Sequence, residues 1–240
     1  MTEPVAPNSG FRVGLIDALN ASRAAERAVL AALDPAERDA PAPDGGWSAK
    51  DIQAHLAAWK RHQVERMAAI REGRDEPPAE AETDEVNARM HAEHADWPWD
   101  RVLVDAEAAS AALVAEVEGA SDATLGLDRI SGTILGNGPE HALAHLPGIA
   151  ARAGAAAESR VLELADTIVA IVDRGDWPSR AGAYARYNLA CYHALAGNLD
   201  VARSLLRQAL PEQESLRTFA PEDDDLIALR DEIPTLAAGG

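Results

Sequence analysis

The sequence predicts an all-α protein, and three observations support this fold class. Alanine leads a hydrophobic fraction of 47%, while aromatic residues make up only 4% of the chain. Alanine is the strongest helix former, and Leu, Arg and Glu follow it closely. Apolar residues recur at helical spacing over several long segments, and no segment shows the period-two alternation of a strand. A chain of 240 residues is long enough to bury most of its apolar surface in one or two domains.

Two long helices are predicted in the first third of the chain. The first covers about residues 9–33 and ends at DPAERDAPAPDGG, where Pro and Gly interrupt the pattern. The second begins after Ser48, which stands in the N-cap position with Asp51 three residues later, as in a capping box. Its apolar stripe continues to about Ile70, and His55 lies within that stripe.

Two further long helices are predicted after a polar connection. A short helix over 84–95 precedes a long one over 98–118. Pro139 suits the first turn of a fourth helix. We expect this helix, or a kinked continuation of it, to cover about 139–173, with the kink at Pro147 because proline removes one backbone donor. The remaining chain is typical of two or three shorter antiparallel helices.

The net charge of the chain disfavours some classes of partner, nucleic acids and membranes among them. The chain has 40 acidic and 22 basic residues, a net charge of -18, and this field repels phosphate backbones and anionic lipid headgroups. We therefore expect no nucleic-acid partner and no membrane association. No stretch has the length and apolarity of a membrane span, and the first residues lack the features of a signal peptide. The only cysteine, Cys191, excludes an intrachain disulfide and fits a reducing cytoplasm.

Four pieces of the chain resemble the DinB-like superfamily and, within it, the ClbS/DfsB family. The first piece is GWSAKDIQAHLAAW, residues 46–59, which is similar to the second helix of the superfamily. Residues 86–118, the GT of ISGTILGN, and NGPEHALAHLPGI at 137–149 follow in the same order. The resemblance implies a bundle of four helices with a long crossover, which we place at residues 1–157.

The resemblance also implies a metal site. Many superfamily members hold a divalent metal through one histidine of the second helix and a histidine pair on the fourth. The matching positions here are His55, His141 and His145. Mycothiol-dependent maleylpyruvate isomerases have a carboxylate in place of one histidine, and that position is His141 here. The ClbS-like branch is associated with self-protection, by hydrolysis of a strained, electrophilic ring in a genotoxic metabolite.

The spacing of the histidines is compatible with metal chemistry. His141 and His145 are four residues apart and project from one face of a helix. With His55 they offer three ligands and one open position, as in a catalytic zinc site. Imidazole suits several transition metals, of which we expect zinc or nickel, and the open position would hold a water or a thiolate. Asp51 and Glu140 are the candidates to hydrogen-bond the remaining imidazole nitrogens.

A structural role for the histidines is the alternative interpretation. A histidine in an apolar stripe is often a hydrogen-bonded core residue, and two histidines four residues apart also arise by chance. A kink at Pro147 would turn the pair away from His55. His91 and His94 are expected to be solvated.

A substrate pocket is expected beside these histidines. Trp59 is one turn from His55, and Trp99 is the second tryptophan that could form a pocket wall. The alternative for both is to fill core volume, which aromatic side chains do well. His62 follows on the same helix face and is expected at the pocket mouth. Asn87 is expected to orient a substrate, unless it is a solvated amide.

The C-terminal part has a resemblance of its own. YNLACYHALAGNLDVARSLLRQALP, residues 187–211, resembles one tetratricopeptide repeat (TPR), with small residues where paired helices approach. This resemblance implies a short TPR-like helical domain over 158–240. A single repeat cannot bury its own face. The domain must therefore pack on the bundle, on a protein partner or on a second copy of the chain.

Three classes of function remain open. The first is a small-molecule-binding bundle protein that detoxifies an electrophilic metabolite as a metal- or water-dependent hydrolase. The second is a non-catalytic module whose tail docks a partner or mediates oligomerisation. The third is a thiol-dependent transferase or a maleylpyruvate-isomerase-like enzyme. The sequence has no GxxxxGK loop, dinucleotide fingerprint or nucleophile elbow, so we expect no nucleotide cofactor.

Overall fold

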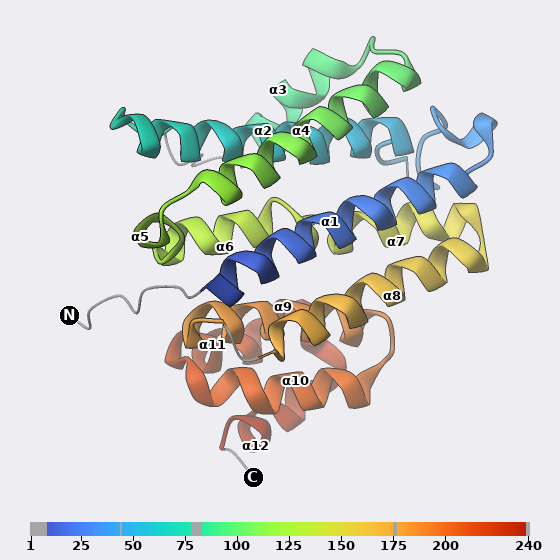
Figure 1. Cartoon of the computed structure of the whole chain (residues 1–240). Coiled ribbons are helices and arrows are strands. Elements are labelled where there is room, and N and C mark those ends of the chain that lie inside the picture. Colours follow the sequence, from blue (N-terminus) through green and yellow to red (C-terminus); the bar gives the residue numbers. More distant parts are fainter. Residues whose placement is uncertain (1–8, 44, 78–82, 175–176, 239–240) are drawn as a thin grey trace.

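The computed structural model describes residues 9–43, 45–77, 83–174 and 177–238, and this part of the chain contains helices and no strand (Figure 1). The all-α fold class is therefore confirmed. Four long helices form a bundle: α1 (Ser9–Ala32), α2 (Ala49–Glu72), α4 (Trp99–Gly119) and α7 (Pro139–Ala153). α2 packs along α4, α1 contacts both α4 and α7, and α7 also contacts α2.

Short helical elements connect the four long helices. They are η1 (Pro35–Glu37), α3 (Thr83–His94), α5 (Asp122–Leu125) and α6 (Asp128–Gly136). α3 lies against α2, and α6 packs on the helix that follows it, α7. These contacts place the α6–α7 turn close to the α2 face that carries the candidate site.

α2 begins as predicted. The Ser48 hydroxyl accepts a hydrogen bond from the Asp51 backbone N–H, and the Asp51 carboxylate accepts one from the Ser48 backbone N–H. Such a capping box satisfies backbone donors that the first helical turn leaves open. The helix ends at Gly73, whose φ of 67° suits glycine. These two ends set the register that places His55 in the second turn.

The predicted helix over 139–173 is two helices. α7 continues through Pro147 to its end, and the chain reverses at Gly154 into α8 (Ala155–Val172). Gly154 has a φ of 97°, a conformation that glycine adopts readily and other residues rarely do. α8 returns along α7 and also packs on α1 (Figure 1). The predicted domain boundary after residue 157 therefore falls inside a helix that packs on the bundle.

The C-terminal part is a helical hairpin followed by short helices. The hairpin is formed by α9 (Ser179–Leu195) and α10 (Leu199–Glu212), and the turn between them contains Gly197 with a φ of 79°. The short helices are α11 (Glu214–Phe219), η2 (Ala220–Glu222), η3 (Asp224–Glu232) and α12 (Ile233–Ala237). α9 packs on α6, α7 and α8, so the hairpin lies against the bundle (Figure 1).

The bundle and the hairpin share one hydrophobic core. Phe11, Leu113 and Leu146 of the bundle belong to the same buried cluster as Leu189 and Leu206 of the hairpin. Each part therefore shields apolar side chains of the other part from solvent. Among the described helices, none is both long and apolar enough to cross a membrane.

Candidate metal centre

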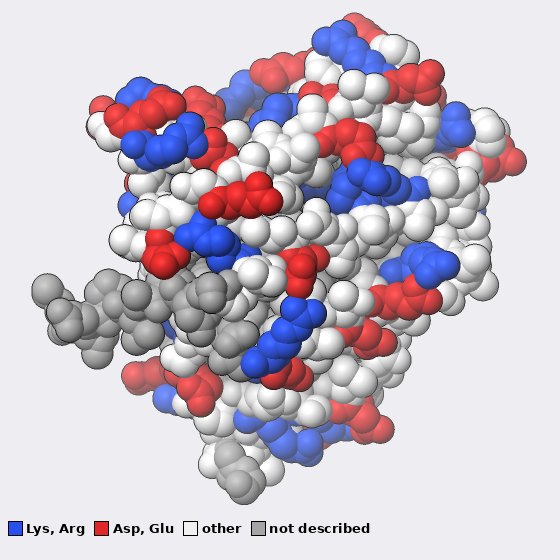
Figure 2. Space-filling view, in the orientation of Figure 1, with Lys and Arg blue, Asp and Glu red and all other residues white. Residues whose placement is uncertain are grey.

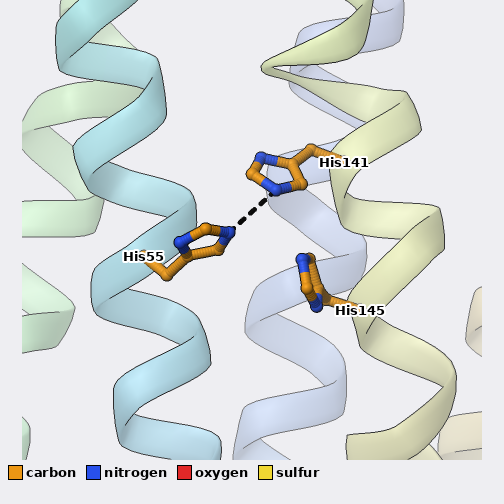
Figure 3. Close-up of side chains that lie close together, drawn as sticks. All are labelled: His55, His141 and His145. Atoms are coloured by element: carbon orange, nitrogen blue, oxygen red, sulfur yellow. Dashed lines mark hydrogen bonds between the residues drawn. The ribbon is translucent and has the colours of Figure 1, made fainter. Parts of the chain in front are cut away.

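Three histidine side chains converge between α2 and α7. His55 projects from α2, and His141 and His145 project toward it from α7 (Figure 3). One ring nitrogen from each residue lies within 4.8 Å of those of the other two. The Nε2 atoms of His55 and His141 are 2.9 Å apart. Pro147 does not turn the pair away from α2, because α7 remains helical on both sides of it.

Burial favours the neutral form of all three imidazoles. Loss of solvent, together with the neighbouring His145, lowers the pKa of His55 to about 4. Loss of solvent, with the nearby His55, lowers the pKa of His141 to about 2, and burial also lowers the pKa of His145. A neutral imidazole carries the lone pair that a metal requires. Near neutral pH the three imidazoles are therefore uncharged, and each can offer a ring-nitrogen lone pair to a metal.

The donor set fits a divalent transition metal. Imidazole nitrogen is a good ligand for zinc, nickel, copper and iron, and three protein ligands leave room for water or substrate. The Nδ1 atoms of His55 and His141 are buried and have no hydrogen-bond partner among the described residues. The three-histidine cluster, His55, His141 and His145, therefore has the character of a binding site.

A pocket of about 310 Å³ opens onto the three-histidine cluster. Its other lining residues are Trp47, Trp59, Asn87, Gly136 and Asn137. The Trp59 indole N–H donates to Asn87 Oδ1 at 3.0 Å, which ties α3 to α2. The Trp47 ring approaches His55 edge-on, with 4.9 Å between ring centroids. The described lining contains no hydroxyl, thiol or carboxylate side chain, so the imidazoles are the nucleophilic side chains among these lining residues.

The two expected partners of the histidine nitrogens are engaged elsewhere. Asp51 is held by the capping box of α2 and lies 3.5 Å from His91 Nε2. Glu140 accepts a hydrogen bond from Asn188 of α9 at 2.8 Å, and burial raises its pKa to about 7. Consecutive residues of a helix point about 100° apart, so Glu140 faces the hairpin while His141 faces α2.

Two of the expected pocket residues line the histidine pocket and two do not. Trp59 and Asn87 line it. His62 contacts the Trp59 ring at 5.5 Å between centroids but lies outside the lining. Trp99 lines a separate pocket between α1 and α4, where the Arg38 guanidinium lies over its ring. Helical periodicity identified the buried face of α4 but did not specify which neighbour Trp99 contacts.

The expectation of two solvated histidines on α3 was wrong for His94. Its side chain is buried, with Nδ1 hydrogen-bonded to the Met90 carbonyl oxygen and Nε2 3.0 Å from an Arg61 nitrogen. His91 is partly exposed and stacks on Trp47, with 5.3 Å between ring centroids. α3 therefore uses both histidines to pack against α2.

Sequence reasoning missed two lining residues, Trp47 and Asn137. Trp47 immediately precedes the N-cap of α2, and its position near the start of the helix carrying His55 was the available signal. Asn137 lies in the turn that leads into α7, four residues before His141, and its amide donates to Gln63 at 3.4 Å. Turns beside a ligand-bearing helix often carry binding residues.

A cluster of buried charges lies beneath the same stretch of α2. The Glu26 carboxylate of α1 is fully buried and receives the Lys60 ammonium at 2.5 Å and the Arg23 guanidinium at 2.9 Å. Gln53 and Ser22 also donate to it. Burial alone would raise the pKa of Glu26, but the two cations lower it below its ordinary value. We call these five residues the Glu26 cluster.

Comparison with known proteins identifies the family. The family model of the DinB superfamily matches residues 18–212, which covers α2, α7 and both helices of the hairpin. The chain belongs to the DinB superfamily. Members of the DinB superfamily commonly bind a divalent metal, and the three-histidine cluster lies inside the matched residues. Neither the curated proteins nor the solved structures compared with the chain gave a match.

Proposed function

We propose that this DinB-superfamily protein is a metal-dependent enzyme that hydrolyses a small electrophilic metabolite. His55, His141 and His145 would hold one zinc or nickel ion. The observation that carries the proposal is the convergence of three imidazoles on a pocket that opens to solvent. The geometry resembles catalytic sites, which keep a position open for substrate, more than closed structural sites.

The residues that line the histidine pocket limit the reactions that it can catalyse. When bound, a divalent cation supplies Lewis acidity, which makes water or a thiol nucleophilic near neutral pH. Because the described lining offers no hydroxyl, thiol or carboxylate, and its imidazoles would be occupied by the metal, no covalent intermediate with the protein is expected there. Trp47 and Trp59 supply apolar walls for a substrate. The Asn87 side chain, fixed by its hydrogen bond from Trp59, can present its amide N–H groups to a polar substrate atom.

Ring opening by water is a reaction that this pocket supports. The water oxygen forms a bond to the electrophilic carbon of a strained ring, and the carbon–heteroatom bond of the ring breaks. The water loses a proton and the released heteroatom gains one, so the reaction needs no oxidant or reductant. The resemblance to the ClbS/DfsB family favours this reaction and a role in self-resistance.

Metal uptake tests the proposal. Chelator-treated protein dialysed against zinc or nickel should bind about one equivalent, as expected of one three-histidine site. Replacing His55, His141 and His145 together with alanine should abolish the uptake. His62→Ala is the matched control, since His62 is on the same helix but outside the lining. Uptake that survives the triple replacement would overturn the proposed site.

A thiol-dependent transferase is the alternative chemistry for the same pocket. The metal-loaded protein should be incubated with a small epoxide or another strained-ring electrophile, with and without a low-molecular-weight thiol. Mass spectrometry of the product then separates the two reactions. Addition of water independent of thiol supports the hydrolase, and a thiol adduct formed faster than without protein supports the transferase.

Exposed apolar residues favour a second candidate function, docking through the C-terminal part. Leu195 at the end of α9 and Phe219 of α11 have 67% and 56% of their surface exposed and line a common pocket. Exposed apolar patches often mark interaction surfaces. If this surface mediates self-association, Leu195→Ser combined with Phe219→Ser should shift the full chain to a smaller species in size-exclusion chromatography. Identical elution of the double variant and the unmodified chain would argue against self-association.

A further inference from the structure

A second pocket with a distinct chemical character lies between α1 and α4. Its volume is about 250 Å³, and it is lined by Arg23, Arg27, Arg38, Trp99, Leu103 and Glu107, among others. Basic side chains gather near the C-terminal half of α1 in Figure 2, on a face that is otherwise mixed in charge. Three arginines against one carboxylate make this lining cationic in a chain whose net charge is -18.

Arg38 provides the clearest sign of a ligand. Its guanidinium lies over the Trp99 ring at 5.1 Å from the ring centroid. Its buried Nε has no hydrogen-bond partner, and none of its nitrogens is in an ion pair within the described part of the chain. A stacked guanidinium keeps its in-plane N–H groups available for a carboxylate or a phosphate. Stacking on Trp99 therefore fixes the orientation of the Arg38 guanidinium and leaves its positive charge unpaired within the described chain.

The remaining charges of the pocket are only partly compensated. Glu107 accepts from Arg23 at 2.6 Å and from Arg27 through two nitrogens at 2.7 and 2.5 Å. Arg23 has only 6% of its surface exposed, and its other terminal nitrogen reaches Glu26 at 2.9 Å, while its buried Nε has no partner within the described chain. Glu26 is already matched by Lys60 at 2.5 Å. The pocket thus has spare positive charge held in fixed positions.

We propose that this pocket binds a small organic anion, a carboxylate with an aromatic or other apolar body. The carboxylate would pair with Arg38 and with the arginines beside Glu107. The body would lie on Trp99 and Leu103, which supply the apolar part of the lining. The site shares no lining residue with the histidine pocket. The inference is therefore independent of the proposed metal chemistry.

Calorimetric titration of the full chain, kept metal-free with chelator, tests the proposal. The probe is 1-naphthoate, which combines a carboxylate with an apolar ring system. Naphthalene-1-methanol, which has a similar body without charge, and inorganic phosphate, which has charge without a body, separate the two contributions. We expect saturable binding of naphthoate at one site and at least about tenfold weaker binding of the other two, as for loss of one charged hydrogen-bonding group.

Two variants with opposite expected effects on naphthoate affinity distinguish a change in the site from a loss of stability. Arg38→Gln should weaken naphthoate binding about tenfold or more, because it removes the planar cation. Glu107→Gln should strengthen binding, because it releases Arg23 and Arg27 from a competing carboxylate, and a merely destabilised protein would not bind more tightly. Arg160→Gln changes an exposed arginine of α8 and is the matched control with unchanged affinity.

Each outcome decides for or against the site. Weakening by Arg38→Gln and strengthening by Glu107→Gln support it. Absence of saturable binding, equal binding of phosphate, or the same affinity in Arg38→Gln overturns it. Loss of naphthoate binding in the triple histidine variant would also overturn it, because binding would then belong to the histidine pocket. Naphthoate binding is measured on metal-free protein, so a failure of metal uptake would not affect it. The anion site and the metal site can therefore be disproved separately.

Discussion

Two polar clusters share α2 and differ in how their hydrogen-bonding groups are used. The Glu26 carboxylate is enclosed by Lys60, Arg23, Gln53 and Ser22, all of which donate to it. The three-histidine cluster lies two turns or less away along the helix. Its rings contact one another and line a pocket that opens to solvent.

The difference separates a structural cluster from a binding site. A buried charge that has its partners makes removal of any one of them costly. Three imidazoles that converge at a pocket can instead take a ligand from solution. The first cluster is therefore expected to determine stability, and the second to determine ligand binding with little effect on the metal-free fold. Substitutions in the two clusters should therefore separate effects on stability from effects on metal binding.

Lys60→Met should be the most destabilising change in this region. It leaves the Glu26 carboxylate buried with one cation fewer, and breaking a buried pair in this way costs about 3–5 kcal/mol. Denaturant unfolding measures the loss. The double change Glu26→Gln with Lys60→Met should recover most of it, because no charge is then stranded. A single-variant loss below about 1 kcal/mol would contradict the structural role of the Glu26 cluster.

Zinc should stabilise the protein through the histidines alone. A free zinc concentration one hundred times the dissociation constant adds about 2.7 kcal/mol to the free energy of unfolding. His141→Ala should lose this gain while the unfolding of the chelator-treated protein changes little. Thermal melts with zinc and with chelator measure the stabilisation by zinc and the stability of the metal-free protein. Equal stabilisation of the variant and the unmodified chain would mean that the metal binds elsewhere.

Ser48→Ala should cost about 1 kcal/mol, the usual price of losing a helix N-cap. The change loosens the first turn of α2, which leads to His55, without touching the histidines. Denaturant unfolding gives the cost, and metal titration shows whether zinc binding weakens with it. Ser159→Ala, on an exposed turn of α8, is the control with little expected effect. No loss of stability in Ser48→Ala would contradict the capping box.

The smallest predicted effect is a pH dependence at Glu107, which pairs with Arg23 of the Glu26 cluster. Hydrogen bonds from Arg27 and Arg23 lower the pKa of Glu107 to about 2, from an ordinary value near 4.5. The folded state therefore binds this proton less readily than the unfolded state. Its contribution is complete above about pH 4.5 and is lost as the pH falls toward 2.

Partial exposure of Glu107 limits this contribution to about 0.5–1 kcal/mol. Comparing Glu107→Gln with the unmodified chain between pH 6 and pH 3 should show a gap that narrows with acid. Glu163→Gln, in an exposed pair on α8, is the control. A gap that widens with acid would contradict the direction of the Glu107 pKa shift.

The sequence predicted the elements whose signals are local. The Ser48 and Asp51 cap, the helical periodicity and Pro139 at a helix start all depend on residues a few positions apart. The break at Gly154 was missed because Pro147 was the stronger local signal, yet α7 tolerates that proline. His55, His141 and His145 were found only because a family resemblance supplied the pairing between distant helices.

Features that depend on contacts between elements were not predictable from local pattern. Trp99 belongs to a buried stripe, but periodicity does not say that its neighbour is Arg38 rather than a histidine. The Glu26 cluster joins Glu26 to Lys60 across 34 positions, and neither residue lies in a recognisable motif. Such pairs emerge only when the packing of α1 on α2 and α4 is known.

Crystals of the zinc-loaded protein, measured at the zinc absorption edge, would locate the bound metal. The anomalous difference map should show one strong peak between α2 and α7, about 2.0–2.1 Å from a nitrogen of each of the three histidines. The buried Cys191 with Asp223 and Asp225 is the other group of potential ligands within the described residues. A peak there, with none between His55, His141 and His145, would contradict a metal site between α2 and α7.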